Sequence, residues 1–145
     1  MKTPIEVLLV DDNPADSDLI SDVLSRNLRL THIHTVTDGA EAIAFLRRQG
    51  KYAKALPPAF VVLDLNLPRM DGRAVLSDIK ADPALRSTPI AVFSTSEAQQ
   101  DVLACYALGA NCYVSKPGSL QDFVSAVTSI GEFWLNVGRL PRQEE

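Results

Sequence analysis

Five short apolar segments recur along the chain and alternate with longer segments in which apolar residues return every three or four positions. The apolar segments cover residues 5–10, 31–36, 59–64, 89–94 and 111–115. Helical periodicity is clear, for example, in Leu19, Ile20, Val23 and Leu24. Buried strands that alternate with crossover helices are typical of a parallel sheet. The pattern therefore predicts an α/β fold of five βα units, a doubly wound parallel five-stranded sheet with helices on both faces.

Polar residues mark where several helices begin and end. Helix starts are predicted at Asn13–Pro14, Asp38–Glu41 and Ser96–Gln99, each with a residue that can cap a helix. Gly109 is a predicted helix end. The stretch Arg47–Pro58 is longer and more basic than a minimal connection, and its glycine and prolines predict a loop. This loop is either a partner contact or tolerated surface.

Composition narrows the classes of protein. With 145 residues and 46% hydrophobic content, the chain can bury the core of one domain. The net charge is −4, and the 14 Lys and Arg are scattered among 18 Asp and Glu, which disfavours nucleic-acid binding. No apolar run approaches the roughly 18 residues that span a bilayer, and no signal-peptide core is present. The expectation is a soluble cytoplasmic protein with no membrane contact.

The cysteines do not predict a metal site or a disulfide framework. Cys105 and Cys112 stand in apolar contexts, whereas the two histidines, His32 and His34, belong to a different segment. Buried reduced thiols are therefore favoured over a zinc site.

Acidic residues follow two of the predicted strands, and a lysine follows a third. Asp64 ends one apolar run, Asp11 and Asp12 end another, and Lys116 ends the short strand near residue 111. Open α/β sheets carry their chemistry at such strand ends. Clustered carboxylates repel one another unless a hard cation such as Mg²⁺ lies between them. These positions favour a metal-assisted phosphoryl-transfer site.

Each residue has a role in that chemistry. Asp64 stands alone at the end of the central strand and is the expected nucleophile, which would form an aspartyl phosphate. Ser94 could donate a hydrogen bond to a phosphoryl oxygen, and Lys116 would add a positive charge. The alternatives are a solvated acidic edge for Asp11 and Asp12, a helix cap for Ser94 and a surface ammonium for Lys116.

The chain resembles the receiver domain of two-component response regulators over almost its whole length. The matching elements are Asp11 and Asp12, the segment 63–72, Ser94, and Tyr113 to Pro117. The resemblance implies a flavodoxin-like fold in which Asp64 accepts a phosphoryl group from a sensor histidine kinase. It also implies that Asp12, Asp64 and the backbone carbonyl of Asn66 bind Mg²⁺ directly, with Mn²⁺ as a substitute, and that Asp11 binds it through water. Ser94 and Lys116 would then contact the phosphoryl group.

Three further positions acquire expected roles from the resemblance. Asn66 and Ser96 flank the site and would tune the lifetime of the phosphoryl group, and neither is an obvious general acid or base. Tyr113 corresponds to an aromatic residue that swings inward when the hydroxyl of Ser94 moves toward phosphate. An ordinary edge-packing role for Tyr113 is the alternative.

A narrower resemblance is to the small single-domain regulators paired with bacterial phytochrome kinases. It rests on the Arg47–Pro58 loop, on residues 93–96 and on the tail 132–135 with 140–141. The predicted division is a receiver domain at 1–138 and a short tail at 139–145, with no output domain. Tyr106, Phe133 and Trp134 form a candidate surface for a homodimer or a partner, although the two tail aromatics could instead fold back on the domain. The output would pass to an unknown downstream protein, and the chain would catalyse only its own phosphorylation and dephosphorylation.

Two other functions remain open. A phosphate-independent pseudo-receiver predicts a missing site residue, and none is missing. A phosphohydrolase with an aspartyl nucleophile usually carries a second aspartate two residues later, where this chain has Asn66, and it needs a cap domain that is not evident here.

Overall fold

The computed structural model describes residues 3–27 and 29–141, and within these residues five strands alternate with five α-helices, as predicted. The strands are β1 (Ile5–Val10), β2 (Thr31–Val36), β3 (Phe60–Leu63), β4 (Ile90–Ser94) and β5 (Cys112–Ser115). The helices are α1 (Pro14–Ser25), α2 (Gly39–Leu46), α3 (Gly72–Ala81), α4 (Gln99–Leu108) and α5 (Leu120–Glu132). A 3-10 turn, η1 (Gly50–Tyr52), precedes β3, and a π-helical segment, η2 (Phe133–Val137), continues α5.

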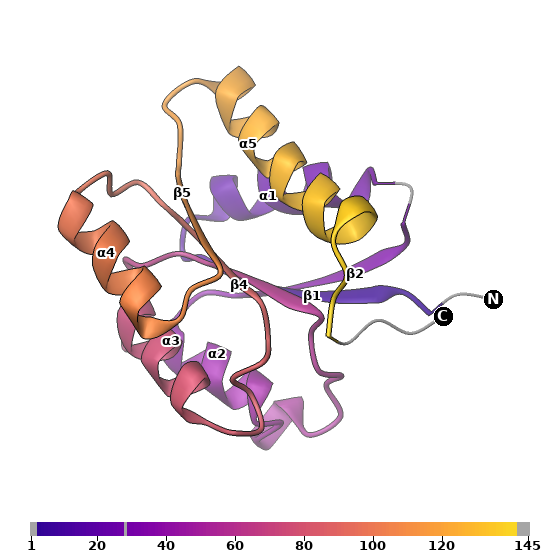
Figure 1. Cartoon of the computed structure of the whole chain (residues 1–145). Helices are drawn as coiled ribbons and strands as arrows, with labels where there is room; N and C mark the ends of the chain where they lie inside the picture. The colour runs from indigo at the N-terminus through magenta and orange to yellow at the C-terminus, as the bar shows by residue number, and fades with distance from the viewer. Residues whose placement is uncertain (1–2, 28, 142–145) are drawn as a thin grey trace.

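The sheet is parallel throughout, with strand order β2-β1-β3-β4-β5. Helices α1 and α5 cover one face, and α2, α3 and α4 cover the other (Figure 1). The predicted doubly wound fold is therefore confirmed. In this topology the carboxyl ends of all five strands lie at one edge of the sheet.

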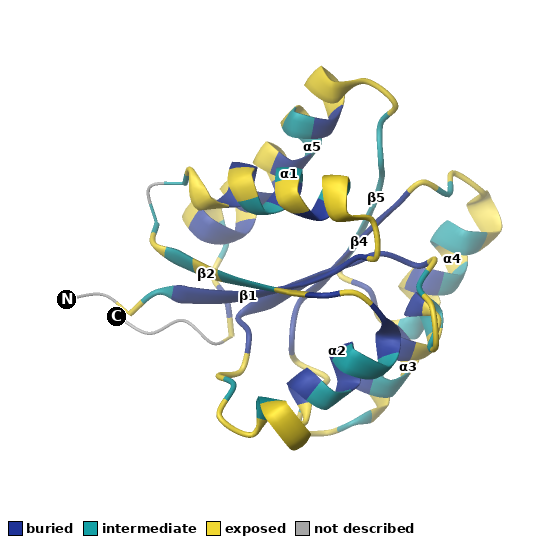
Figure 2. Cartoon of the chain, turned by 180° about the vertical axis from the view of Figure 1, so that it is seen from behind, coloured by how far each residue is buried: buried dark blue, intermediate teal, exposed yellow. Residues whose placement is uncertain are grey.

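Strand β1 shows why the predicted strands read as unbroken apolar runs. Val7 and Leu9 pack into the core beneath α1 and α5, whereas Leu8 and Val10 pack into the core beneath α2, α3 and α4. All four side chains are fully buried, and β1 is dark blue along its length in Figure 2. Since each such side chain contributes roughly 1.5–3 kcal/mol to stability, burial on both faces fixes the strand in the middle of the sheet.

Two predicted helix caps are present. The Oδ1 atom of Asn13 accepts a hydrogen bond from the backbone N–H of Asp16 at 3.1 Å. The Oδ1 atom of Asp38 accepts one from the N–H of Glu41 at 2.8 Å. Side-chain oxygens thus satisfy backbone donors that have no partner within the helix.

The predicted cap at Ser96 is wrong, because α4 begins later, at Gln99, after Ala98. The hydroxyl of Ser96 instead donates to Asp101 at 2.5 Å and accepts from the N–H of Ala98 at 3.3 Å. The side chain is therefore part of the β4–α4 loop. The helix end at Gly109 is confirmed, with φ = 106°, a conformation that favours glycine.

The two tail aromatics have different environments. Trp134 is only 8% exposed, and its ring centroid lies 4.9 Å from that of Phe60 in β3. The candidate surface must therefore be corrected, since Trp134 is a core residue. Phe133 is 54% exposed and Tyr106 is 49% exposed, so both remain on the surface. Of the tail expected at 139–145, residues 142–145 lie outside the described residues.

The Arg47–Pro58 stretch is the predicted loop, and its middle is held against α2. The ring centroid of Tyr52 lies 5.2 Å from that of Phe45, and its hydroxyl donates to Glu41 at 2.9 Å.

Both cysteines are free thiols, with Cys105 buried and Cys112 half-buried on opposite sides of the sheet. In the described part of the chain, every helix is too short or too polar to cross a membrane.

Candidate functional site

Three aspartates meet at the carboxyl edge of the sheet. Asp11 and Asp12 follow β1, and Asp64 follows β3, its neighbour in the sheet. Each offers a carboxylate oxygen, and these oxygens all lie within 4.8 Å of one another. Asp11 and Asp64 are buried, whereas Asp12 is exposed, so the cluster opens to solvent on one side.

Lys116, which follows β5, reaches into this cluster. Its Nζ atom donates to Asp11 Oδ2 at 2.7 Å, to Asp16 Oδ2 at 2.9 Å and to Asp64 Oδ2 at 3.1 Å. The side chain is only 4% exposed. Burial alone would lower the pKa of Lys116, but the hydrogen bonds to Asp11 and Asp16 outweigh it and raise the pKa. The lysine is therefore a permanent positive charge at this site.

Burial and a neighbouring negative charge both disfavour the ionised form of Asp11. Burial raises the pKa of its carboxyl, and the hydrogen bonds from Lys116 and from the N–H of Asn13 only partly oppose this rise. The nearby charge of Asp64 adds to it. A further positive charge would relieve this unfavourable balance, which is the environment that a divalent cation fits.

The backbone that carries Asp64 is held from two sides. The N–H of Leu65 donates to Asp64 Oδ1 at 2.7 Å, and the N–H of Gly72 donates to the Leu65 carbonyl at 2.8 Å. A Cβ atom at Gly72 would lie 2.2 Å from the Asp64 carbonyl oxygen, so only glycine permits this approach. The start of α3 thus presses directly against the loop that positions Asp64.

Ser94 and Tyr113 are joined through Ser96. Ser94 is fully buried at the end of β4, and its Oγ accepts from the N–H of Ser96 at 3.3 Å. The hydroxyl of Tyr113 donates to the Ser96 carbonyl at 2.8 Å. Burial is the main cause that raises the pKa of this tyrosine, so its hydroxyl remains a donor at neutral pH. A movement of Ser94 would therefore change the position of Ser96, and with it the hydrogen bond that Ser96 accepts from Tyr113.

The predicted site residues do not all converge. Asp11, Asp12, Asp64 and Lys116 form one cluster, and Asn66 is exposed just beyond Leu65. The side chain of Ser96, in contrast, is directed to Asp101 in α4 rather than to the carboxylates.

Two contributors were not predicted. Asp16, in the first turn of α1, joins the carboxylates on Lys116. Asp101, in the first turn of α4, accepts from both Ser96 and Arg73 at 2.5 and 2.7 Å. Both aspartates occupy the first turn of a helix that starts at the carboxyl edge, and this position is the signal that could have identified them.

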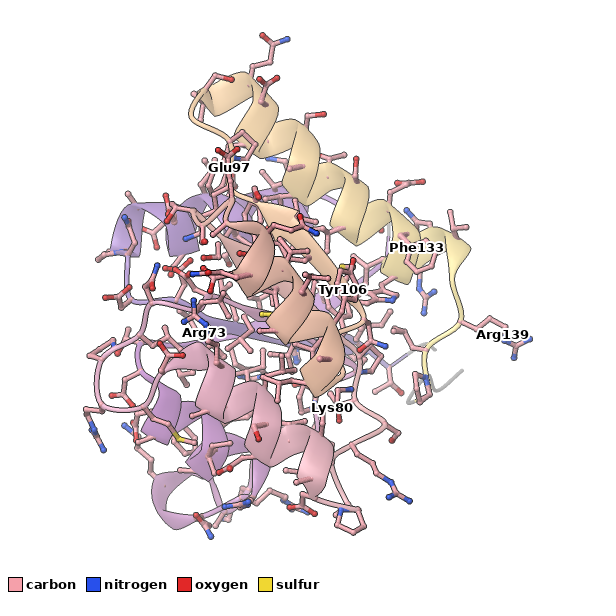
Figure 3. All side chains as sticks on the ribbon, turned by 60° about the vertical axis from the view of Figure 1, so that its left-hand side comes forward. Arg73, Lys80, Glu97, Tyr106, Phe133 and Arg139 are labelled. Atoms are coloured by element: carbon pink, nitrogen blue, oxygen red, sulfur yellow. The ribbon has the colours of Figure 1, made fainter. Side chains whose placement is uncertain are left out.

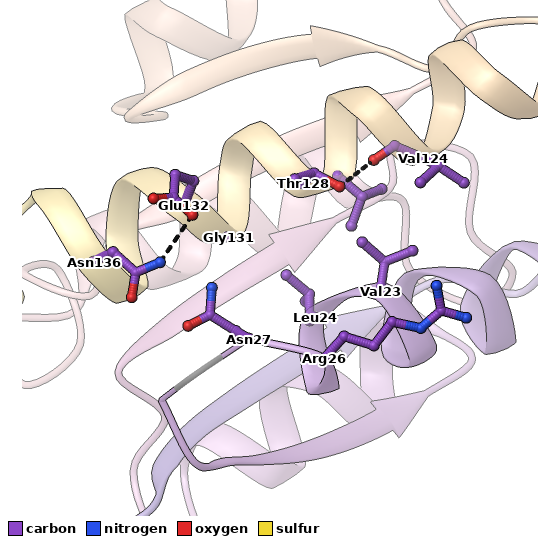
Figure 4. Close-up of a pocket in the computed structure, with 10 residues that line it drawn as sticks. Val23, Leu24, Arg26, Asn27, Val124, Thr128, Gly131, Glu132 and Asn136 are labelled. Carbon is purple, nitrogen blue, oxygen red and sulfur yellow. Dashed lines mark hydrogen bonds between the residues drawn. The ribbon is translucent and has the colours of Figure 1, made fainter.

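Other clusters and grooves lie away from this edge. Glu6, near the start of β1, accepts from His32 at 3.0 Å and is bonded to His34 at 2.7 Å. A groove of about 610 Å³ runs between α1 and α5, where Gly131 lies against Leu24 (Figure 4). Its lining residues come from these helices and from the segments that follow them, not from the strand ends.

Both the sequence and the structure are similar to those of known proteins. Residues 7–128 match the response regulator receiver domain family. The response regulator Rcp1 of Synechocystis sp. is 42% identical over 138 residues, which cover 95% of this chain and 94% of that protein. The phosphorylated cyanobacterial phytochrome response regulator RcpA superposes with a TM-score of 0.94 at 43% identity, over 97% of this chain and 100% of that one. The Mn²⁺-bound form of Rcp1 superposes with a TM-score of 0.93 at 42% identity, over 96% of this chain and 100% of that one.

Proposed function

The chain belongs to the response regulator receiver domain family, and we propose that its Asp64 accepts a phosphoryl group from a histidine kinase in a reaction that requires a divalent cation. The observation that carries the proposal is the setting of Asp64. Its carboxylate is buried at the end of a central strand, 3.1 Å from the Nζ of Lys116 and beside the oxygens of Asp11 and Asp12. A nucleophile, a fixed positive charge and a cation-binding cluster are thus present together.

Asp12, Asp64 and the backbone carbonyl of Asn66 are the groups that would bind the cation directly, with Asp11 binding through water. The spacing of the carboxylate oxygens suits a hard cation with several oxygen ligands. Burial is the main cause that raises the pKa of Asp11, and the nearby charge of Asp64, which adds to this rise, is a charge that such a cation would offset. When bound, the cation neutralises charge on the phosphoryl oxygens. Mg²⁺ is the proposed physiological ion, and the Mn²⁺-bound relative supports Mn²⁺ as a substitute.

The transfer itself is a substitution at phosphorus. A carboxylate oxygen of Asp64 forms the new P–O bond while the P–N bond of the phosphohistidine breaks, and the histidine keeps the electron pair and takes a proton. Lys116 holds its ammonium beside the acceptor, and the Ser94 hydroxyl is the donor that moves to the phosphoryl group. Beyond its own phosphorylation and dephosphorylation, we assign the chain no further catalysis.

The lifetime of the acyl phosphate would depend on Asn66 and Ser96, the two positions that flank the site. Asn66 is exposed next to the acceptor loop, whereas the Ser96 hydroxyl is engaged by Asp101. An amide is neither a general acid nor a general base at neutral pH, so slow hydrolysis is expected. The replacement Ser96→Glu, followed by the decay of labelled phosphate, measures any role of position 96.

Phosphorylation would change the surface through Ser94 and Tyr113. If Ser94 moves toward the phosphoryl group, it withdraws from the N–H of Ser96, and Ser96 is the residue whose carbonyl holds Tyr113. The α4–β5–α5 surface carries this tyrosine and would therefore respond. Tyr113→Ala should retain phosphorylation but reduce the response of this surface.

The same surface is the proposed homodimer interface. Tyr106 on α4 and Phe133 beyond α5 are both exposed and are seen on the same side of the molecule in Figure 3. Between β5 and the end of α5 lies a groove of about 470 Å³, lined by apolar residues that include Val114, Ile130 and Phe133. Exposed apolar surface of this kind favours association.

The partners follow from the family and its relatives. The similarity to a phytochrome response regulator supports a bacterial phytochrome histidine kinase as the phosphodonor, and an unidentified downstream protein would read the signal through protein contacts. We propose a receiver domain at 1–138 followed by a tail at 139–145. The proposed compartment is the cytoplasm, where sensor kinases present their phosphohistidine, and neither nucleic acid nor membrane is a proposed partner.

Intact-protein mass after incubation with acetyl phosphate and Mg²⁺ tests the proposal without the kinase. The wild type should gain one phosphoryl adduct, and Asp64→Asn should gain none. Asp71→Asn is the matched control, because it removes a carboxylate from the same loop but not from the cluster. A folded wild type that gains no adduct would instead support a phosphate-independent interaction module, and release of phosphate from small phosphomonoesters would support a hydrolase.

A further inference from the structure

Lys116 has no hydrogen-bond donor left for a phosphoryl group. A lysine ammonium has three N–H donors. Three acceptors lie within bonding distance of the Nζ of Lys116, namely the Oδ2 atoms of Asp11 at 2.7 Å, of Asp16 at 2.9 Å and of Asp64 at 3.1 Å. A phosphoryl oxygen can therefore bond to this lysine only if one of the three carboxylates gives up its place.

Asp16 is the carboxylate best suited to leave. Its side chain is 27% exposed, against 2% for Asp11 and 10% for Asp64, so water can solvate it when it separates from the lysine. During the proposed transfer Asp64 must stay beside Lys116 as the acceptor, and Asp11 belongs to the cation cluster. Asp16 alone approaches from a helix, α1, where the cap formed by Asn13 fixes its backbone N–H.

We propose that Asp16 is a positioning residue for phosphoryl transfer, which holds Lys116 in the unphosphorylated protein and is displaced when a phosphoryl oxygen binds the lysine. The inference rests on the proposed function of Asp64. A phosphoryl group brings between one and a half and two negative charges to the site, so it both attracts Lys116 and repels the carboxylate that competes for it. Asp16 thus favours cation binding and opposes phosphoryl binding.

Removal of the Asp16 charge should change cation affinity and phosphorylation rate in opposite directions. Loss of the Asp16 charge should weaken divalent-cation binding, because the cluster is less negative and the freed Lys116 binds Asp11 and Asp64 more closely. We expect a three- to tenfold weaker affinity, on the order of the loss of one nearby partly screened charge. At saturating cation, in contrast, phosphorylation should become about three- to tenfold faster, because a lysine donor is free and repulsion is smaller.

The test compares Asp16→Asn with two other replacements. Asp16→Glu keeps the charge and the reach to Lys116, and it should restore values close to those of the wild type. Asp18→Asn is the matched control, because it removes one charge from the exposed side of the same helix. The readouts are the Mn²⁺ dissociation constant of the unphosphorylated protein by calorimetry, and the initial rate of adduct formation from acetyl phosphate at saturating Mg²⁺.

The outcomes separate this inference from the function on which it rests. Weaker Mn²⁺ binding together with faster labelling in Asp16→Asn, but not in Asp18→Asn, supports it. If both asparagine variants behave alike, or if labelling slows in Asp16→Asn while its thermal unfolding is unchanged, the inference is wrong. A wild type that is not labelled at all would overturn the proposed function, whereas the Mn²⁺ measurement would still report on the contact between Asp16 and the cluster.

Discussion

The close contact at Gly72 gives a sharp test of how the fold positions Asp64. A Cβ atom at residue 72 would lie 2.2 Å from the Asp64 carbonyl oxygen and 2.6 Å from the Leu65 Cα. Both are backbone atoms next to β3, so neither can rotate away as a flexible side chain could. In Gly72→Ala, the start of α3 must move away from the acceptor loop, or the loop must move away from α3.

The expected loss of stability can be worked out from two opposing contributions. Forcing an extra methyl group into a packed position costs about 1–3 kcal/mol, and the upper end applies here because the contacts are with backbone. Gly72 is not among the glycines with positive φ, so alanine also stabilises by about 0.4–1 kcal/mol through the unfolded chain. The net loss is about 2 kcal/mol, which corresponds to a midpoint of thermal unfolding lower by about 4–8 °C.

Urea unfolding of Gly72→Ala and Gly118→Ala, each compared with the wild type, measures this effect. Gly118 is the matched control, because a Cβ atom there would have nothing within 4 Å. We expect the urea midpoint to fall by about 1 M in Gly72→Ala and to stay constant or rise slightly in Gly118→Ala. Phosphorylation by acetyl phosphate should also slow in Gly72→Ala, since Asp64 moves with its loop. A Gly72→Ala protein as stable as Gly118→Ala would refute the close-contact argument.

Three further predictions concern the charged cluster, the β4–α4 loop and the exposed surface. Lys116→Met should lower the unfolding free energy by about 3 kcal/mol without metal, because the buried carboxylates lose the ammonium that pairs with them, and Mg²⁺ should restore part of this loss. Equal stability of the variant in chelator and in Mg²⁺ would argue against this expectation. Asp101→Asn should speed amide exchange around Ser96, because it removes the carboxylate that accepts the hydrogen bond of the Ser96 hydroxyl. Since this hydroxyl lowers the pKa of Asp101, protection of the loop in the wild type should stay constant from neutral pH down to about pH 5 and weaken only as the pH falls through the acid range. Phe133→Ser should lower the dimer fraction in sedimentation, whereas Leu30→Ser, which replaces a slightly more exposed apolar residue elsewhere, should not.

The sequence predicts the sheet well because each strand carries its own signal. Burial on both faces requires an apolar residue at almost every position, and β1 and β3 meet this requirement. Capping residues are similarly local, as at Asn13 and Asp38. Ser96 shows the limit of such signals. The spacing of Ser96 to a glutamine fits a helix cap, but the Ser96 hydroxyl bonds to the Asp101 carboxylate instead. A capping pattern in the sequence does not show that another side chain will bind the hydroxyl.

The site was predictable as far as strand order places residues at one edge. Asp11, Asp64 and Lys116 each end a strand, so the parallel topology alone brings them together. Asp16 depends in addition on how α1 leaves the edge and which of its sides faces β5, and periodicity does not determine either. Trp134 continues the buried side of α5 after Val127 and Ile130, but it was assigned to a candidate surface because it stands beside Phe133 beyond the length needed to cover the sheet.

The charge balance of the site explains why cation and phosphoryl chemistry should be linked. The site holds four carboxylates, from Asp11, Asp12, Asp16 and Asp64, and the one ammonium of Lys116, which leaves a formal balance of three negative charges. A phosphodonor is itself an anion and is repelled by such a site. A bound divalent cation removes most of that repulsion, and displacement of Asp16 from Lys116 supplies a donor for the incoming group. Binding of the cation should therefore precede productive binding of the phosphodonor, and cation affinity should in turn rise when the phosphoryl group is present, because linkage between two ligands is reciprocal.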